Sequence, residues 1–308
     1  MPEDPLPSWR EGSPKSAITR FVDAVATGPE AVPAPERIAV FDNDGTLWPE
    51  KPMPAQLHYI VEQWKAAAGR DPGLADVEPY RSILRNDFGW LQHAFALHAQ
   101  GQDSELRTVV AAITKETSSV SVTEYAESVS RFMQTAKHPT LGRSYSRTVY
   151  QPMIELLRHL GASGFTCFVV SGSDRDFMRP IVQSCYGIPP ERVIGSALGL
   201  NYDAGTAEVR YGSTFAFMDD GPEKPVRIWS RIGRRPLFAA GNSDGDAQML
   251  DYTLGGSRGA LALLVQHDDV GRDDEPYEAG AESVRAAAAD RGITNVSIAR
   301  DWARVFPL

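Results

Sequence analysis

The stretch that decides the fold is R-I-A-V-F-D-N-D-G-T-L-W, residues 37–48. The apolar run at 38–41 is continuous, which is typical of a strand buried on both faces in a parallel sheet. The run ends at Asp42, and Asp44 follows two residues on. Two carboxylates at the carboxyl end of such a strand lie where open α/β sheets bind ligands. Their repulsion predicts a metal ion or a catalytic role, although an acidic turn gives the same pattern.

The chain around this stretch has an α/β rhythm. Three further apolar runs with strand character lie at 165–170, 237–240 and 260–265. Helical patterns precede or separate them, which predicts an α/β core with a mainly parallel sheet. Residues 193–211 flank an Asp-Ala-Gly turn and predict an antiparallel hairpin.

Residues 50–149 differ from the rest of the chain. Four amphipathic helical patterns follow one another there without a convincing strand, and the last begins with a capping box formed by Ser121 and Glu124. We therefore expect an all-helical insertion at 50–149, with residues 1–49 and 150–308 forming the core.

Length and charge narrow the class of protein. A chain of 308 residues exceeds the usual size of a single core, so two domains are expected. The net charge of −9 argues against nucleic acid as a partner, since phosphate backbones require a clustered positive face. No apolar run reaches the length of a membrane span, and the first residues lack a signal-peptide pattern. A cytoplasmic location is expected, although an exported form with its leader removed stays open.

Polar side chains follow three of the predicted strands. Asp42 and Asp44 follow the first, Ser171 follows the second, and the loop 241–246 follows the third. The carboxyl ends of parallel strands share one edge, so we expect these side chains to lie close together. Lys224 stands between the second and third of these strands along the chain, early in a helical pattern.

Each of these features also has an ordinary structural reading. A Ser-Gly-Ser sequence after a strand is typical of a capped helix start, and a single lysine is usually solvated. The loop 241–246, G-N-S-D-G-D, has the composition of a turn or of a loose calcium site. Their joint order favours one shared site, because each follows a predicted strand or begins a helix.

Carboxylates, a hydroxyl and an ammonium group together predict a phosphate-handling site. Hard oxygen ligands bind Mg²⁺, which offsets the repulsion between an acidic nucleophile and an anionic substrate. One carboxylate can attack phosphorus to give an aspartyl-phosphate, and a second can move the protons of the leaving oxygen and the attacking water. Ser171 and Lys224 can hold the phosphoryl oxygens in the transition state.

With these residues the chain resembles the haloacid dehalogenase-like hydrolase superfamily, in its phosphoserine-phosphatase-like branch. The four motifs of the superfamily are matched in order by D-x-D-G-T at 42–46, Ser171, Lys224 and the acidic loop 241–246. The resemblance implies a Rossmann-like three-layer core with an all-helical cap at 50–149.

The resemblance also implies a role for each matched residue. Asp42 would be the nucleophile and Asp44 the general acid and base. The phosphate would be bound by Ser171, Gly172, Lys224 and Thr46. Mg²⁺ would be held by Asp42, the backbone carbonyl of Asp44, Asn242 and Asp246, while the choice between Asp244 and Asp246 stays open. The side chains expected to shape the substrate pocket are Trp48 and Glu50, with hydrophobic cover as the alternative for Trp48.

Two positions depart from the phosphatases that the chain resembles. Those proteins usually carry an aspartate at the position of Asn242, so this chain has one negative charge fewer there. Lys51, with Glu50 beside it, stands where phosphoserine phosphatases carry a glutamate that binds the substrate amine. The second departure argues against phosphoserine as the substrate.

The sequence therefore predicts a Mg²⁺-dependent phosphatase that hydrolyses a small phosphorylated metabolite by way of an aspartyl-phosphate. Two alternatives stay open. One is a phosphotransferase or mutase of the same superfamily. The other is a catalytically weak module that binds phosphate or metal, which the amide at Asn242 motivates. Neither the physiological substrate nor the oligomeric state is predicted.

Overall fold

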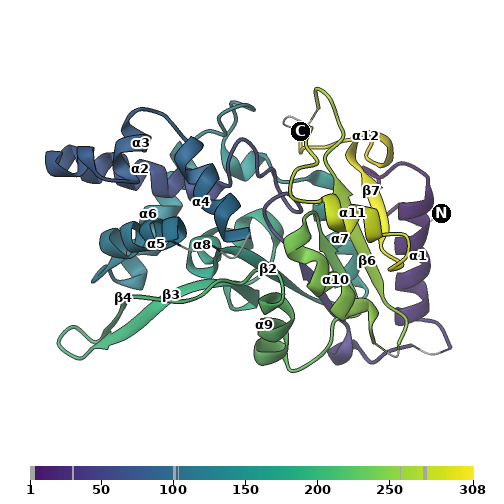
Figure 1. Cartoon of the computed structure of the whole chain (residues 1–308). Helices are drawn as coiled ribbons and strands as arrows, with labels where there is room; N and C mark the ends of the chain where they lie inside the picture. Colours follow the sequence, from purple (N-terminus) through teal and green to yellow (C-terminus); the bar gives the residue numbers. More distant parts are fainter. Residues whose placement is uncertain (1–3, 30, 100–101, 103, 257, 273–275) are drawn as a thin grey trace. The chain divides into compact units, whose positions relative to one another are not determined.

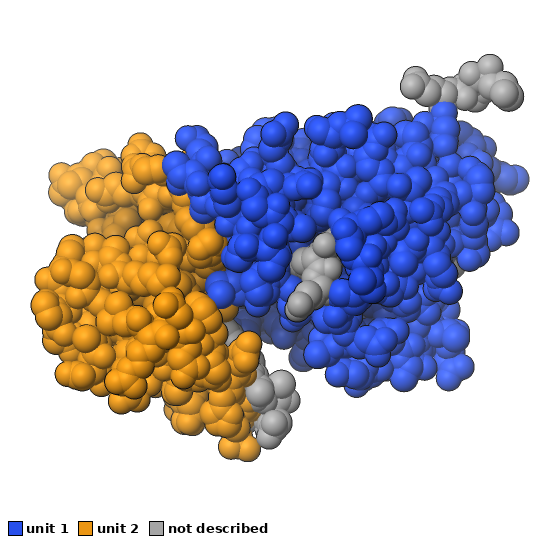
Figure 2. Space-filling model, turned by 90° about the horizontal axis from the view of Figure 1, so that it is seen from above, with its two compact units in different colours: residues 1–54, 133–196, 218–308 blue, residues 55–132, 197–217 orange. Residues whose placement is uncertain are grey.

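The computed structural model describes residues 4–29, 31–99, 102, 104–256, 258–272 and 276–308. The chain divides into two compact units, which are coloured separately in Figure 2. Unit 1 comprises residues 1–54, 133–196 and 218–308, and unit 2 comprises residues 55–132 and 197–217. No helix in the described ranges is both long and apolar enough to cross a membrane.

Unit 1 is built on a parallel sheet with the strand order β3-β2-β1-β5-β6-β7, of which Figure 1 labels β2, β3, β6 and β7. Its strands are β1 (Ile38–Phe41), β2 (Thr166–Asp174), β3 (Val193–Asp203), β5 (Phe238–Gly241), β6 (Leu261–Gln266) and β7 (Thr294–Ser297). The predicted strand at 38–41 lies near the middle of this sheet, and each of its four residues is buried, as a parallel strand covered on both faces requires.

Helices cover both faces of the sheet. They are α1 (Ser13–Ala26), α7 (Gln151–Ala162), α8 (Arg175–Tyr186), α9 (Glu223–Ile232), α10 (Ala247–Leu254), α11 (Glu282–Ala287) and α12 (Ile298–Asp301). On one face Val40 shares a core with Ile228 of α9 and Leu250 of α10. On the other face Phe238 lies 5.2 Å from Phe41 and 6.0 Å from Phe21 of α1, measured between ring centroids. The predicted Rossmann-like three-layer α/β core is confirmed.

Two details of this sheet differ from the sequence-based expectation. β2 continues through Ser171 to Asp174, with a register shift between these two residues, so the Ser-Gly-Ser sequence is not a helix start. The cap of α8 is instead Asp174, whose side chain accepts from the backbone N–H of Asp176 at 2.8 Å. β7 was not expected, because Thr-Asn-Val-Ser lacks the apolar run that marks the other strands.

Unit 2 contains the helices of the insertion. They are α2 (Ala55–Arg70), α3 (Tyr80–Leu84), α4 (Gly89–Ala99), α5 (Ser104–Thr117) and α6 (Val122–Thr135), of which α6 ends just beyond the unit. The predicted capping box is present at α6. The backbone N–H of Ser121 donates to Glu124 at 2.8 Å, and the Ser121 hydroxyl accepts from the backbone N–H of Glu124 at 3.1 Å.

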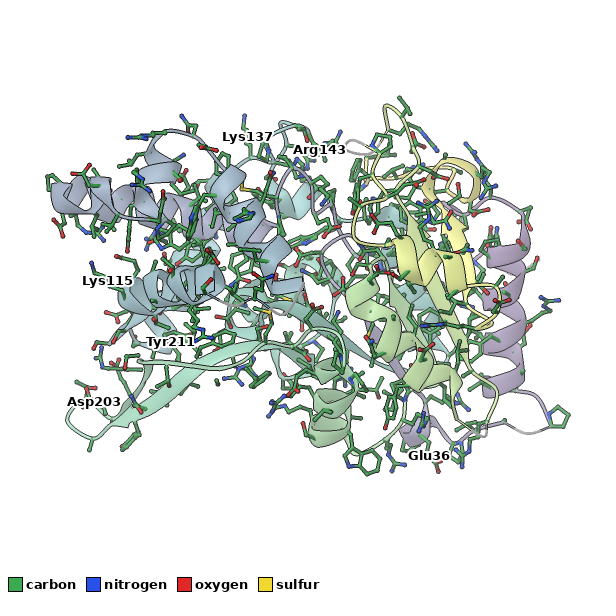
Figure 3. The ribbon with its side chains drawn as sticks, viewed as in Figure 1. Glu36, Lys115, Lys137, Arg143, Asp203 and Tyr211 are labelled. Atoms are coloured by element: carbon green, nitrogen blue, oxygen red, sulfur yellow. The ribbon has the colours of Figure 1, made fainter. Side chains whose placement is uncertain are left out.

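The described residues of the expected insertion, 50–149, contain helices and no strand, as predicted, but unit 2 also includes a hairpin from outside that range. The end of β3 pairs antiparallel with β4 (Glu208–Phe217), and the labels of Asp203 and Tyr211 mark this predicted hairpin in Figure 3. The hairpin belongs to unit 2. Tyr211 of β4 attaches it to the helices, because its backbone exchanges 2.9 Å hydrogen bonds with Ser119 and Val120. The ring of Tyr211 also lies 5.1 Å from that of Tyr125 on α6.

The boundaries of the units also differ from the expected 50 and 149. Residues 133–149 belong to unit 1, where Tyr145 packs on Trp48 with ring centroids 6.3 Å apart. This segment lacks a strand pattern, and its membership of the core depends on such long-range contacts, which sequence periodicity does not report.

Candidate active site

The carboxyl ends of three neighbouring strands meet at one edge of the unit 1 sheet. Phe41 of β1 pairs with β2 on one side and with Ala240 of β5 on the other. Asp42 keeps this alignment, because its backbone N–H donates to the carbonyl of Ala240 at 2.9 Å. Ser171 lies in the end of β2 and Asn242 directly follows β5, so both reach the same edge as Asp42.

Lys224 is the cation of this edge. It is the second residue of α9, and it is only 2% exposed. Its ammonium group donates to Asp42 Oδ1 at 2.8 Å, to Asp246 Oδ1 at 2.6 Å and to the carbonyl of Val170 at 3.2 Å. An ammonium group has three N–H donors, so the protein uses all of them. Lys224 is therefore a fixed positive charge between two buried carboxylates, not a solvated lysine.

These contacts shift the pKa values of the cluster. Burial raises the pKa of Asp42 and the charge of Asp246 raises it further, while Lys224 acts in the opposite direction, so the pKa lies well above the usual carboxyl range. Burial acts to lower the pKa of Lys224, but the carboxylates of Asp246 and Asp42 outweigh it and raise this pKa. Lys224 thus stays protonated, and its charge is what opposes neutralisation of Asp42.

Asp44 has both of its carboxylate oxygens oriented by donors. Oδ1 accepts from Trp48 Nε1 at 2.8 Å, and Oδ2 accepts from the hydroxyl of Ser173 at 2.6 Å. Burial raises the pKa of Asp44, and these two hydrogen bonds only partly offset that effect. Asp44 consequently takes up a proton more readily than an exposed aspartate does.

The indole of Trp48 covers this carboxylate. It is 1% exposed and packs against Tyr145 and Tyr186, with ring centroids 6.3 Å and 6.2 Å away. Of the two interpretations of Trp48, this placement matches hydrophobic cover, with the added task of donating to Asp44.

The loop after β5 lies directly on the turn after β1. Asn242 Oδ1 accepts from the hydroxyl of Thr46 at 3.0 Å, and Asn242 Nδ2 donates to Glu50 Oε1 at 3.2 Å. A Cβ at Gly45, where φ is +82°, would lie 2.1 Å from Asn242 Nδ2, so glycine is required there. Thr46 and Glu50, expected at the phosphate and in the substrate pocket, both bond to Asn242.

The two aspartates of this loop have different surroundings. Asp246 is fully buried, and its Oδ2 accepts from the backbone N–H groups of Asn242 and Ser243 while its Oδ1 accepts from Lys224. Asp244 is turned to α11, where its oxygens accept from the backbone N–H groups of two residues, 283 and 284. The structure therefore brings Asp246 into the cluster and leaves Asp244 outside it.

Ser171 and Gly172 complete the predicted set. Ser171 is 1% exposed, and its hydroxyl accepts from the backbone N–H of Ser173 at 3.2 Å. Gly172 is exposed, and its carbonyl accepts from the hydroxyl of Ser196 at 2.6 Å. The bulge in β2 thus presents a hydroxyl and an accessible glycine backbone beside the buried carboxylates.

Three residues of this region were not predicted. Ser173 binds Asp44, and its spacing of two from Ser171 in a strand was an available signal. His267 Nε2 lies 2.8 Å from the carbonyl of Gly45, and the hydroxyl of Tyr277 donates to Glu50 at 2.6 Å. No local pattern marks His267 or Tyr277, because their partners are more than 200 residues away in the chain.

The oxygen atoms at this edge of the sheet are suitable ligands for a magnesium ion. Among the described residues, Asp42 Oδ2 accepts no hydrogen bond, and Asn242 Oδ1 keeps one lone pair beyond its bond to Thr46. Carboxylate, amide and backbone oxygens are the ligands that Mg²⁺ prefers. The described residues contain no cluster of three or more His, Cys, Asp and Glu side chains placed to hold a metal, so the fit depends on the amide and backbone oxygens. Asp246, predicted as a ligand, already has protein donors on both oxygens.

The polar side chains of this three-layer α/β core gather at adjoining strand ends, which is where open α/β sheets bind their ligands. The family model of the haloacid dehalogenase-like hydrolases matches residues 39–251, and the chain belongs to this family. The predicted superfamily is thereby confirmed. A search of curated proteins found no match.

Several solved structures are similar to this chain. A protein of unknown function from Bordetella pertussis is 17% identical with a TM-score of 0.54, covering 85% of this chain and 98% of its own. A functionally unknown protein from Anaerococcus prevotii is 15% identical with a TM-score of 0.55, covering 92% and 91% respectively. Cytosolic 5′-nucleotidase IIIB bound to cytidine is 12% identical with a TM-score of 0.49, covering 95% and 89%. The first two likenesses concern the fold.

Proposed function

We propose that this protein is a magnesium-dependent phosphatase that hydrolyses a small phosphomonoester through an aspartyl-phosphate at Asp42. The observation that carries the proposal is the different set of partners around two carboxylates at one strand end. Asp42 is paired with a buried ammonium group at 2.8 Å, whereas the carboxylate of Asp44 is held by two neutral donors, Trp48 and Ser173. The first arrangement places a fixed positive charge beside a nucleophile, and the second orients a carboxyl group for proton transfer.

The reaction has two steps. A carboxylate oxygen of Asp42 attacks phosphorus while the bond between phosphorus and the ester oxygen breaks, and Asp44 gives its proton to the leaving oxygen. A water molecule then attacks phosphorus, Asp44 takes its proton, and the Asp42 carboxylate is released with inorganic phosphate. Trp48 and Ser173 keep Asp44 oriented in both steps.

Neutralisation of the phosphoryl charge falls to several groups. Ser171 and the backbone of Gly172 would bind phosphoryl oxygens, and Lys224 would contribute its fixed charge from beside the nucleophile. Mg²⁺ would be held by Asp42, the carbonyl of Asp44 and Asn242. When bound, it supplies the charge that lets an anionic nucleophile approach an anionic ester.

The substrate class follows from the family and the charge of the chain. Phosphatases of this kind act on small phosphorylated compounds, and a net charge of −9 gives no footprint for nucleic acid. Unit 2 would serve as the cap that the resemblance implies, with the hairpin 197–217 contributing to it alongside the helices.

The test is turnover of an aryl phosphate by the full chain with Mg²⁺. Asp42→Asn should reduce kcat by roughly 10⁴-fold or more, as removal of a nucleophile does elsewhere. Chelation of divalent ions should abolish the activity of the wild type, and added Mg²⁺ should restore it. Turnover by Asp42→Asn at the wild-type rate would refute the proposal.

Asp244→Asn is the matched control. It makes the same chemical change in a loop aspartate whose oxygens face α11, so its turnover should stay close to that of the wild type. An equal loss in both variants would indicate a general effect of charge at this edge and would remove the assignment of Asp42 as nucleophile.

A further inference from the structure

The side-chain amide of Asn242 has two chemically different ends, and only one of them can bind a cation. Its Oδ1 accepts from Thr46 at 3.0 Å, and its Nδ2 donates to Glu50 at 3.2 Å. If the amide were turned over, N–H groups would replace the oxygen at the metal site. The orientation of this one amide therefore decides whether Asn242 is a ligand at all.

Glu50 is the neighbour that decides this orientation. The hydroxyl of Thr46 can donate or accept, so it would tolerate either end of the amide. A carboxylate only accepts, so Nδ2 is the end of Asn242 that must face Glu50. The steric contact with Gly45 leaves the amide little room to move away from this pairing.

Glu50 is itself held in place by a chain of contacts. The hydroxyl of Tyr277 donates to the same Oε1 at 2.6 Å, and the ring of Tyr277 is stacked on His267 with centroids 4.4 Å apart. His267 in turn contacts the carbonyl of Gly45 at 2.8 Å. The chain of contacts from Glu50 through Tyr277 and His267 therefore ends at Gly45, in the turn that follows Asp42. It fixes Glu50 relative to the buried carboxylates before any ligand binds.

The charge of Glu50 matters as well as its shape. Asn242 is neutral, so Asp42 supplies the only side-chain charge in the proposed ligand set. A divalent cation bound by hard oxygens is stabilised by further negative charge close by. Glu50 is the carboxylate bonded to the far end of the Asn242 amide, so it places a negative charge one hydrogen bond away from the ligand.

We propose that Glu50 is a positioning residue for the metal site, which turns Asn242 Oδ1 to the cation and adds the charge that an amide ligand lacks. This inference rests on the proposed function, since it takes the metal from there. It assigns Glu50 to the metal site and not to the substrate pocket that the sequence predicts.

Calorimetric titration of Mg²⁺ into the metal-free full chain tests this inference without measuring turnover. Glu50→Gln keeps the shape of the side chain but removes its negative charge. A glutamine can also bond to either end of the Asn242 amide, so Nδ2 no longer has to face residue 50. The Kd for Mg²⁺ should therefore rise about 10- to 100-fold. Glu278→Gln, in a side chain that is 75% exposed, is the control and should leave the Kd unchanged.

The double variant Asn242→Asp with Glu50→Gln provides the rescue. The carboxylate introduced at position 242 presents an oxygen to the cation in either orientation and restores the negative charge. The amide introduced at position 50 can donate a hydrogen bond to this carboxylate. The Kd for Mg²⁺ should therefore return toward the wild-type value. Weak binding by Glu50→Gln without rescue would mean that Glu50 acts through packing, which overturns the orientation argument. Circular dichroism of each variant verifies the fold.

The outcomes separate this inference from the function on which it rests. Wild-type binding of Mg²⁺ with an unchanged Kd in Glu50→Gln would overturn the role of Glu50 and leave the proposed phosphatase intact. Absence of Mg²⁺ binding by the wild type at millimolar concentration would remove the metal from the proposed function, and the role of Glu50 with it.

Discussion

Replacement of Lys224 by methionine tests the charge balance of the cluster most directly. The variant keeps an unbranched side chain but removes the ammonium group that lies 2.8 Å from Asp42 and 2.6 Å from Asp246. Asp42 is 6% exposed and Asp246 is 0% exposed, so water cannot replace the lost donor without rearrangement. Removing one partner of a buried ion pair costs about 3–5 kcal/mol, and we expect the free energy of unfolding to fall by that amount.

The measurement is urea denaturation at neutral pH, followed by circular dichroism and extrapolated to zero denaturant. Arg291→Met is the control, because it breaks an ion pair in the same unit, with Asp251 at 2.9 Å, whose side chains are 40% and 45% exposed. An exposed pair contributes about 1 kcal/mol or less. If Lys224→Met lost no more stability than this control, the charge balance described for the cluster would be wrong.

The pH dependence of the same variant adds a second check. Burial and Asp246 already hold the pKa of Asp42 above its unfolded value, and loss of Lys224 removes the contact that opposes them. The folded variant then binds more protons than the unfolded chain, so its stability falls as the pH rises. We expect the deficit relative to the wild type to shrink as the pH is lowered from neutral. A deficit that grows on acidification would contradict this sign.

Two further substitutions address the turn after β1 and the proton carrier. Ser173→Ala removes a donor that stabilises the charged form of Asp44, so the pKa of Asp44 should rise. The descending limb of kcat/KM against pH for an alkyl phosphate should therefore move to higher pH, and an unmoved limb would exclude Asp44 as the acid. Gly45→Ala should destabilise the chain more than Gly280→Ala in thermal melts, because the φ values are alike at +82° and +84° but only Gly45 has a neighbour, Asn242, within contact. Gly45→Ala should lose about 1–3 kcal/mol more of the free energy of unfolding than Gly280→Ala, which is the usual cost of overpacking. Equal losses would mean that the Asn242 side chain moves aside at no cost.

The core of the fold can be predicted from the sequence, because a buried parallel strand is marked by a continuous run of apolar residues. The run at 38–41 and the strands that became β2, β5 and β6 are continuous apolar segments, and each is followed by polar residues. β7 has no such run, since it lies at the sheet edge with a half-exposed Thr294 and an exposed Asn295. The hairpin was recognised from its turn, but its membership of unit 2 depends on Tyr211, whose backbone partners are some 90 residues earlier in the chain.

The candidate site can be predicted from the sequence to a similar extent. Residues that directly follow strands, such as Asp42 and Asn242, could be placed at one edge because parallel strand ends coincide. The different surroundings of Asp244 and Asp246 could not be predicted from the sequence, because both residues stand in one short acidic loop. Only the position of α11 distinguishes them. The contacts of Glu50 likewise depend on Tyr277, which no spacing rule connects to it.

The contacts around Asp42 also determine when this site can come into existence during synthesis. Lys224 stands 182 positions after Asp42, His267 stands 222 after Gly45, and Tyr277 stands 227 after Glu50. A ribosome adding about 5–20 residues per second needs roughly 10–45 s to cover the longest of these intervals. The nascent chain therefore carries its strand with Asp42 and Asp44 for most of translation without the lysine that balances it. An amino-terminal fragment that ends before α9 would contain the strand end with Asp42 and Asp44 but neither Lys224 nor the loop 241–246, so it could not form the site.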